Sequence, residues 1–173
     1  MDKRRGRNLQ KVGTKKVLVI RVDAQDSSTT ATEAQLGDDI FGQAGDLVNL
    51  KSQYLKCSHD QLNFTALESK TEVGTDGIYT LTLPEDVRGQ KDNPIVWRIV
   101  NQAQSELGGS LNIIADHVIV CMPPGTAGGW IAYAYINHWL SVYNNNWCRY
   151  PSGLMHELGK LWFVLSCSAL GKH

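Results

Sequence analysis

Two short runs rich in β-branched residues constrain the fold of this 173-residue chain more than any other feature. The first is "KVLVIRV" at residues 16–22, and the second is "HVIVC" at residues 117–121. A strand exposed on one face alternates apolar and polar residues, whereas these runs are apolar almost throughout, as in strands buried on both faces. We therefore expect both to be interior strands of one mixed β-sheet with helices packed on it, which is an α/β fold.

Local patterns predict the helices around this sheet. Thr32 and Gln35 fit a capping box, which would start a helix at that point. The clearest helix is "NPIVWRIVNQAQSELGG", in which Pro94 occupies the first turn and the glycine pair ends the helix. Its apolar stripe is Ile95, Ile99, Ala103 and Leu107. Two more helices are expected, one with the stripe Leu47, Leu50, Tyr54 and Leu55, and a final one starting near Ser152.

Three further segments have the pattern of strands. "QLNFTAL" alternates apolar and polar residues and is predicted to be half-exposed, with the glycosylation sequon at Asn63 on its solvent face. "GIYTLTLP" is bounded by a turn pair before it and by Pro84 after it. "WIAYAYINHWLSVYNNNW" is rich in aromatic residues and strand-like, and it breaks at residues 144–146.

The charge balance excludes some partners. Lysine and arginine together number 17, as do aspartate and glutamate, so the net charge is zero and gives no general attraction to nucleic acid or to an anionic membrane. Residues 1–15 are basic and precede the first strand, which predicts a solvated arm. No run reaches the roughly 18 apolar residues of a membrane helix, and no signal peptide is visible after the basic start.

Several candidate sites have ordinary explanations. "VIVCMPPGTAGGW" lacks the lysine of a phosphate-binding loop and is predicted to be a turn between strands. Asp38 and Asp39 are adjacent on a helix and point about 100° apart, so they are expected on a solvated face and not at one reacting centre. The isolated histidines are read as surface or core residues; they are His59, His117 and His138.

The pair His156-Glu157 in "MHELG" begins the pattern H-E-x-x-H of zinc proteases. In that pattern the two histidines leave one face of a helix and share one zinc ion, while the glutamate acts on the zinc-bound water. A histidine–glutamate pair is common by chance, so its meaning depends on the rest of the chain.

Five segments in order resemble the gametolysin family of zinc endopeptidases, which are of the metzincin type. They are "KVLVIRVDAQDSSTTATEAQLGDDIFG", "LKSQYLKCSHDQLNF", "GIYTLTL", "DHVIVCMPPGTAGGWIAYAYINHWLSVYNNNWC" and "MHELG". The resemblance implies that residues 16–159 are the N-terminal part of a metzincin-like catalytic domain whose C-terminal subdomain is missing. It implies His156 as the first zinc ligand, Glu157 as the general base, and an extracellular protease that acts on polypeptides such as cell-wall proteins.

The sequence departs from the family after Gly159. The metzincin pattern H-E-x-x-H-x-x-G-x-x-H requires histidines at 160 and 166 and a glycine at 163, where this chain has Lys160, Ser166 and Phe163. An ammonium group has no lone pair for zinc. We therefore expect residues 160–173 to be an aberrant tail, from a retained intron, a frameshift or a pseudogene. The codons for Gly-Lys-Leu can contain GGTAAGTT, which matches a splice donor.

The chain as written is thus expected to be an inactive fragment that binds no zinc, whereas the intact family binds zinc and cleaves polypeptides. Three hypotheses stay open: an active secreted protease, if residues 160–173 are not its true sequence; a non-catalytic remnant that binds peptides around residues 130–141; or an unfolded pseudogene product. In a secreted parent, Cys57, Cys121 and Cys148 are expected to pair with one another or with cysteines beyond the break, and Cys167 in the tail is expected to lack a native partner.

Overall fold

The structure is a computed structural model that describes residues 12–68, 73, 76–136 and 138–162. Its strands form one mixed sheet in the order β2-β1-β4-β6-β5, and β3 also pairs with β1. All neighbours are parallel except β5 and β6. The strands are β1 (Gly13–Ala24), β2 (Leu62–Ala66), β3 (Ile78–Leu83), β4 (His117–Met122), β5 (Ala132–Ala134) and β6 (Leu140–Asn144).

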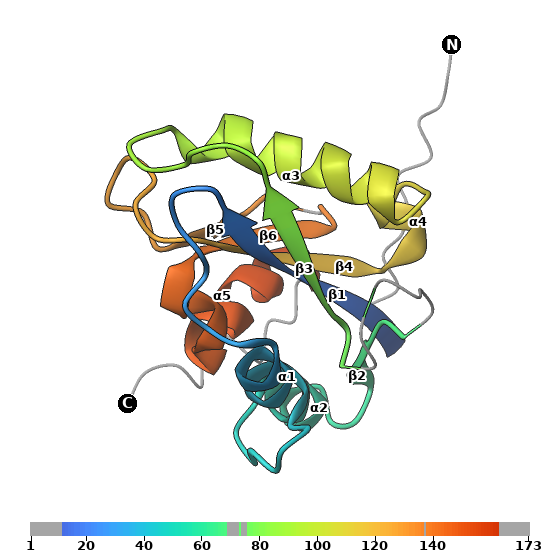
Figure 1. Ribbon diagram of the computed structural model, residues 1–173. Helices are drawn as coiled ribbons and strands as arrows, with labels where there is room; N and C mark the ends of the chain where they lie inside the picture. Colours follow the sequence, from blue (N-terminus) through green and yellow to red (C-terminus); the bar gives the residue numbers. More distant parts are fainter. Residues whose placement is uncertain (1–11, 69–72, 74–75, 137, 163–173) are drawn as a thin grey trace.

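Helices cover both faces of this sheet (Figure 1). On one face lie α3 (Asp92–Glu106) and α4 (Leu111–Ile114). The other face is covered by α1 (Glu33–Phe41), α2 (Leu50–Cys57) and α5 (Pro151–Trp162), with the 3-10 helix η1 (Asn145–Arg149) leading into α5. The α/β fold with a mixed sheet and packed helices is therefore confirmed.

The two apolar runs are interior strands, as predicted. The strand β1 has β2 and β3 on one side and β4 on the other, and β4 lies between β1 and β6. Leu18 and Ile20 point into the core under α3, whereas Val17 and Val19 point into the core shared by α1, α2 and α5. Both faces are buried, which explains why these strands need apolar residues at almost every position. The strand β1 begins at Gly13, three residues before the predicted run.

Most of the predicted helices are confirmed. Thr32 and Gln35 form the capping box of α1, and the whole stripe of α3 is buried. The final helix begins at Pro151, next to the predicted Ser152. The prediction for Leu47 is wrong, because α2 begins only at Leu50 and Leu47 is 85% exposed in the preceding turn.

The predicted strands are present, but the aromatic segment forms two strands where one strand-like segment was expected. Leu62 and Phe64 of β2 are buried while Asn63 and Thr65 are half-buried, so the sequon lies on the more exposed side of this edge strand. The aromatic segment forms two strands, β5 and β6, joined by a turn. It ends at η1, where the asparagine-rich break was predicted.

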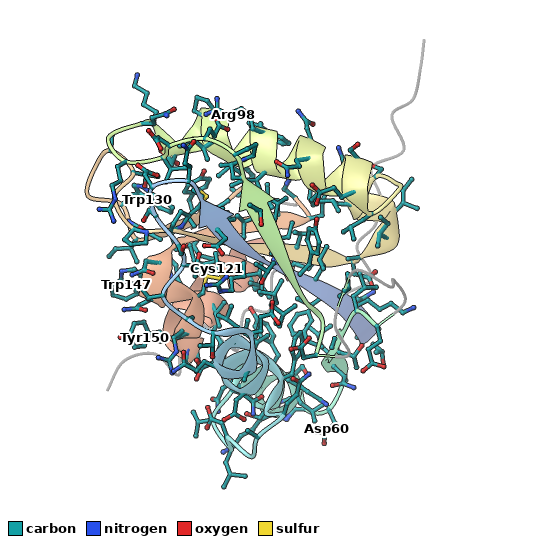
Figure 2. The ribbon with its side chains drawn as sticks, viewed as in Figure 1. Asp60, Arg98, Cys121, Trp130, Trp147 and Tyr150 are labelled. Atoms are coloured by element: carbon teal, nitrogen blue, oxygen red, sulfur yellow. A yellow bond between two sulfur atoms is a disulfide. The ribbon has the colours of Figure 1, made fainter. Side chains whose placement is uncertain are left out.

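A disulfide joins Cys121 of β4 to Cys148 of η1, with a Cα–Cα distance of 5.8 Å. Figure 2 shows Cys121 on the α5 side of the sheet. The bond holds η1 against the central strand, and η1 leads directly into α5. Pairing among the first three cysteines is thus confirmed for this pair, while Cys167 lies outside the described residues.

Replacing both cysteines, as in Cys121→Ala with Cys148→Ala, should lower the free energy of unfolding by about 3.5 kcal/mol. The bond joins residues with a sequence separation of 27 and restricts the conformations of the unfolded chain. Without the bond the unfolded chain has a higher conformational entropy, which favours unfolding. Urea unfolding of the oxidised wild type and the double variant measures the difference. Equal unfolding midpoints would show that the bond contributes no stability.

Candidate functional site

The helix α5 places His156 and Glu157 in opposite environments. The side chain of His156 is 71% exposed, whereas that of Glu157 is 6% exposed. Neighbouring residues on a helix point about 100° apart, so one faces solvent and the other faces the sheet. His156 Nε2 lies 3.9 Å from Glu157 Oε1. The pair therefore presents an accessible imidazole in front of a sheltered carboxylate.

Contacts with α2 and β6 fix the position of α5. The Tyr54 hydroxyl of α2 donates a hydrogen bond to the Met155 carbonyl, at 3.0 Å. Tyr143 of β6 is fully buried in the same core as Leu154 and Leu158 of α5. Burial raises the pKa of Tyr143, and the charge of Glu157 raises it further, while Ser141 lowers it. Tyr143 thus lies in the electrostatic neighbourhood of Glu157, which sequence patterns alone did not indicate.

The residues that the structure describes do not form a zinc site. Across the described part of the chain, no group of three or more histidine, cysteine, aspartate or glutamate side chains is arranged to hold a metal. A zinc site of the protease type needs three protein ligands and one open position. Position 160, where the second imidazole would leave the same face of α5 as His156, is a lysine, and residues 163 and 166 lie outside the described residues.

The strand β5 lies at the end of the sheet and also contacts α5. Among the described residues, no strand pairs with its outer side. The Asn144 N–H donates to the Ile131 carbonyl at 2.9 Å, so Ile131 and Tyr133 turn their backbone groups toward β6. The backbone groups of Ala132 and Ala134 therefore point outward, because hydrogen-bonding direction alternates along a strand.

The side chains of Ala132 and Ala134 pack on the core that α5 covers. They are small, so a second extended chain could approach β5 and α5 together. A free strand edge of this kind is a template for an extended peptide, which pairs through its main chain. This edge falls within residues 130–141, the segment proposed from the sequence for peptide binding.

The other predicted candidates have structural roles. His117 is fully buried, and its Nε2 lies 2.8 Å from Ser141 Oγ, which confirms a core histidine. Burial lowers the pKa of His117 to about 3, and the neighbouring His138 also lowers it. His59 is exposed, and His138 lies in the β5–β6 turn.

The solvated-face prediction for Asp38 and Asp39 is wrong. Asp38 Oδ1 accepts hydrogen bonds from the N–H groups of Ala44 and Asp46, at 2.8 and 3.0 Å. Asp39 pairs with Arg149 of η1 at 2.6 Å, with 19% of the aspartate side chain exposed. Asp38 therefore fixes the loop that follows α1, and Asp39 links α1 to η1, which is far away in sequence.

The glycine-rich loop after β4 connects strands, as predicted. The Gly89 N–H donates to the Gly125 carbonyl at 2.8 Å, and the Ala127 N–H donates to the Gln90 carbonyl at 2.7 Å. Gly125 has a φ of +104°, and a Cβ there would come within 2.9 Å of the Arg88 side chain. The glycine is therefore explained by a close approach of two loops, without a bound phosphate.

Comparisons with known proteins do not assign a family. No known family and no curated protein matches the chain. One solved structure that the chain partly resembles is described as "Structure of a chaperone-substrate complex", with 15% identity and a TM-score of 0.49. The similarity covers 87% of this chain and 23% of that one, and it does not indicate a function. The resemblance to gametolysins therefore stays a prediction.

No helix among the described residues is long and apolar enough to cross a membrane.

Proposed function

We propose that this chain is the N-terminal part of the catalytic domain of a gametolysin-like zinc metalloendopeptidase, which acts outside the cell on polypeptides such as cell-wall proteins. In its present sequence it holds an extended polypeptide on the free edge of β5 but does not cleave it. His156 occupies the position of the first zinc ligand, and Glu157 occupies the position of the general base.

The observation that carries this proposal is the position of α5 beside the open strand β5. The helix exposes His156 on its surface and contacts the strand whose outer backbone groups are free. A peptide paired with Ala132 and Ala134 would extend the sheet by one strand. Its backbone would then run next to the helix that carries His156, which supports the proposal.

The same residues explain why cleavage is not expected. Lys160 follows His156 by four residues and therefore has the place of the second ligand. A charged ammonium group repels a metal ion and has no lone pair to donate. Without a metal-bound water, Glu157 has no activated nucleophile to deprotonate. Binding and catalysis are thereby separated in this chain.

Blocking the edge of β5 should abolish peptide binding. Ala134→Pro removes an N–H group that points outward, and proline is tolerated on edge strands because it disturbs no internal pair. We expect at least about a tenfold loss of affinity for a short extended peptide, measured by isothermal titration calorimetry. Ala134→Ser keeps the N–H group and is the matched control, and thermal unfolding checks that both variants fold.

A second form of the test does not depend on the variant. A peptide that is N-methylated at every amide has no N–H group on either edge to donate to the free carbonyl groups of β5, so it should bind at least about tenfold more weakly than the unmethylated peptide. Equal affinities for the two peptides, together with unchanged binding by Ala134→Pro, would show that the edge of β5 is not the binding site.

An active protease is a second candidate, because the departure from the family is confined to the residues after Gly159. If residues 160–173 are a retained intron, the spliced message would encode histidine, glycine and histidine at the metzincin spacing. Sequencing the transcript across the Gly159 codon tests this origin. A spliced message that still encodes Lys160 would rule out the intron.

A further inference from the structure

Aromatic rings form a continuous row beside β5, on the opposite face of the sheet from α5. Trp130 lies 5.6 Å from Tyr133, Tyr133 lies 6.0 Å from Tyr135, and Tyr135 lies 5.6 Å from His138, between ring centroids. At the end of the row, the His138 ring is stacked on Trp139 at 5.0 Å, and it meets Trp97 of α3 edge to face at 6.4 Å.

Hydrogen bonds hold the row in place while leaving its surface accessible. The Trp130 Nε1–H donates to Thr126 Oγ1 at 3.1 Å, and the Asn93 side-chain amide donates to the Tyr135 hydroxyl at 2.9 Å. Tyr135 and Trp97 are exposed, the latter at 39%. Ordered aromatic rings that stay in contact with solvent lose little conformational entropy when a partner covers them, so they are suited to binding.

The spacing of the rings matches that of an extended chain. Side chains on one face of a strand repeat every two residues, which is about 6.6 Å. The centroid distances between Trp130, Tyr133 and Tyr135 are 5.6 and 6.0 Å. A peptide added to the outer edge of β5 would therefore place every second side chain over this row, and the intervening side chains toward α5.

The strands that carry the row have no charged residue, and the charge beside it comes from Asp92 of α3, which interacts with Tyr133. No aspartate, glutamate, lysine or arginine occurs from His117 to Cys148, which includes all of β5 and β6. Burial lowers the pKa of His138, so its ring is neutral at neutral pH. Ile131 and Ile136, at the two ends of β5, are exposed and apolar. Natural edge strands are usually protected by charges or prolines, and β5 has neither.

We propose that this aromatic row selects the polypeptide that β5 accepts, favouring extended segments with apolar side chains at alternate positions. The inference rests on the proposed function, because it requires a peptide paired with β5. The row acts as a specificity surface: apolar side chains are buried against the rings, whereas a charged side chain at the same place would lose water and find no charged partner on β5 or β6.

Three blocked eight-residue peptides test the selection, with serine at every second position and leucine, lysine or glutamate at the others. We expect the leucine peptide to bind at least about tenfold more tightly than either charged peptide, since each leucine buries apolar area. Comparing lysine with glutamate separates loss of apolar contact from a general charge effect. Isothermal titration calorimetry gives the three affinities.

A pair of tryptophan variants links the selection to the row. Trp97→Gln should weaken binding of the leucine peptide by about three- to tenfold and reduce its advantage over the charged peptides. Trp147→Gln is the matched control, because Trp147 is also 39% exposed but lies in η1, beside α5 (Figure 2). It should leave the affinities unchanged, and thermal unfolding verifies that both variants fold.

The outcomes separate this inference from the proposed function. If all three peptides bind equally and N-methylation still weakens binding, the edge of β5 receives peptides but the row does not select them, and the inference is wrong. If no peptide binds, or N-methylation has no effect, both proposals fail. A concentration-dependent dimer in analytical ultracentrifugation that Ala134→Pro abolishes would overturn the inference too, because a second copy would then occupy the edge.

Discussion

Changing three residues after Gly159 should give this chain tight zinc affinity. In the variant Lys160→His, Phe163→Gly, Ser166→His, the imidazoles at 156 and 160 would leave one face of α5, four residues apart, and the third would follow a glycine turn. Zinc bound to three such ligands contributes of the order of 10 kcal/mol in intact structural sites. We therefore expect zinc affinity to rise at least about a thousandfold, measured in competition with a chromophoric chelator.

The matched control carries the same three changes together with His156→Ala. If His156 is a zinc ligand, this control should lose most of the gained affinity. The expected gain concerns zinc affinity alone, and peptide hydrolysis is not part of this prediction. Equal zinc affinity in the wild type and the triple variant would contradict the assignment of α5 as a zinc-binding helix.

Acid should destabilise the fold through His117. The pKa of this histidine is lowered to about 3 in the folded protein, from 6.5 for an ordinary histidine, so the unfolded chain binds more protons between these values. The contribution of neutral His117 to the free energy of unfolding is fully present above pH 6.5, and it is lost as the pH falls toward 3. At pH 4 the loss amounts to about 3 kcal/mol, from about 1.4 kcal/mol for each pH unit below 6.5.

The variant His117→Gln isolates this contribution. Its neutral amide can still bond to Ser141, whose Oγ contacts His117 Nε2 at 2.8 Å, but it does not titrate. Urea unfolding at pH 7 and pH 4 should show that the wild type loses about 3 kcal/mol more than the variant. His138 is present in both proteins, so its protonation contributes to the loss of stability in each and does not account for the difference between them. An equal loss in both would mean that His117 is protonated in the folded state.

The sequence predicted those parts of the fold that depend on local or periodic patterns. β1 and β4 were found because strands buried on both faces need apolar residues throughout, and α1 and α3 because caps and apolar stripes repeat at short spacing. The same reasoning placed the start of α5 within one residue. It failed at Leu47, since an apolar residue before a helix has the same spacing as one inside it.

The remainder depends on contacts between distant residues. Asp39 was expected in solvent because nothing near it in sequence reveals Arg149, 110 residues away. The position of Tyr143 near Glu157 follows from the packing of α5 on the sheet, and the outward direction of the Ala132 and Ala134 backbone follows from the pairing of β5 with β6. His156 and Glu157 were identified from the start of a zinc-protease motif and from the family resemblance, and the structure adds their opposite exposure and the contact of their helix with an open strand.

The most direct test is the zinc content and peptidase activity of the purified chain, measured after dialysis against zinc and then against metal-free buffer. We expect far less than one zinc per chain by elemental analysis, and no cleavage of an extended peptide that nevertheless binds. One zinc per chain, with cleavage that a chelator stops and Glu157→Gln abolishes, would contradict the proposed separation of binding from catalysis.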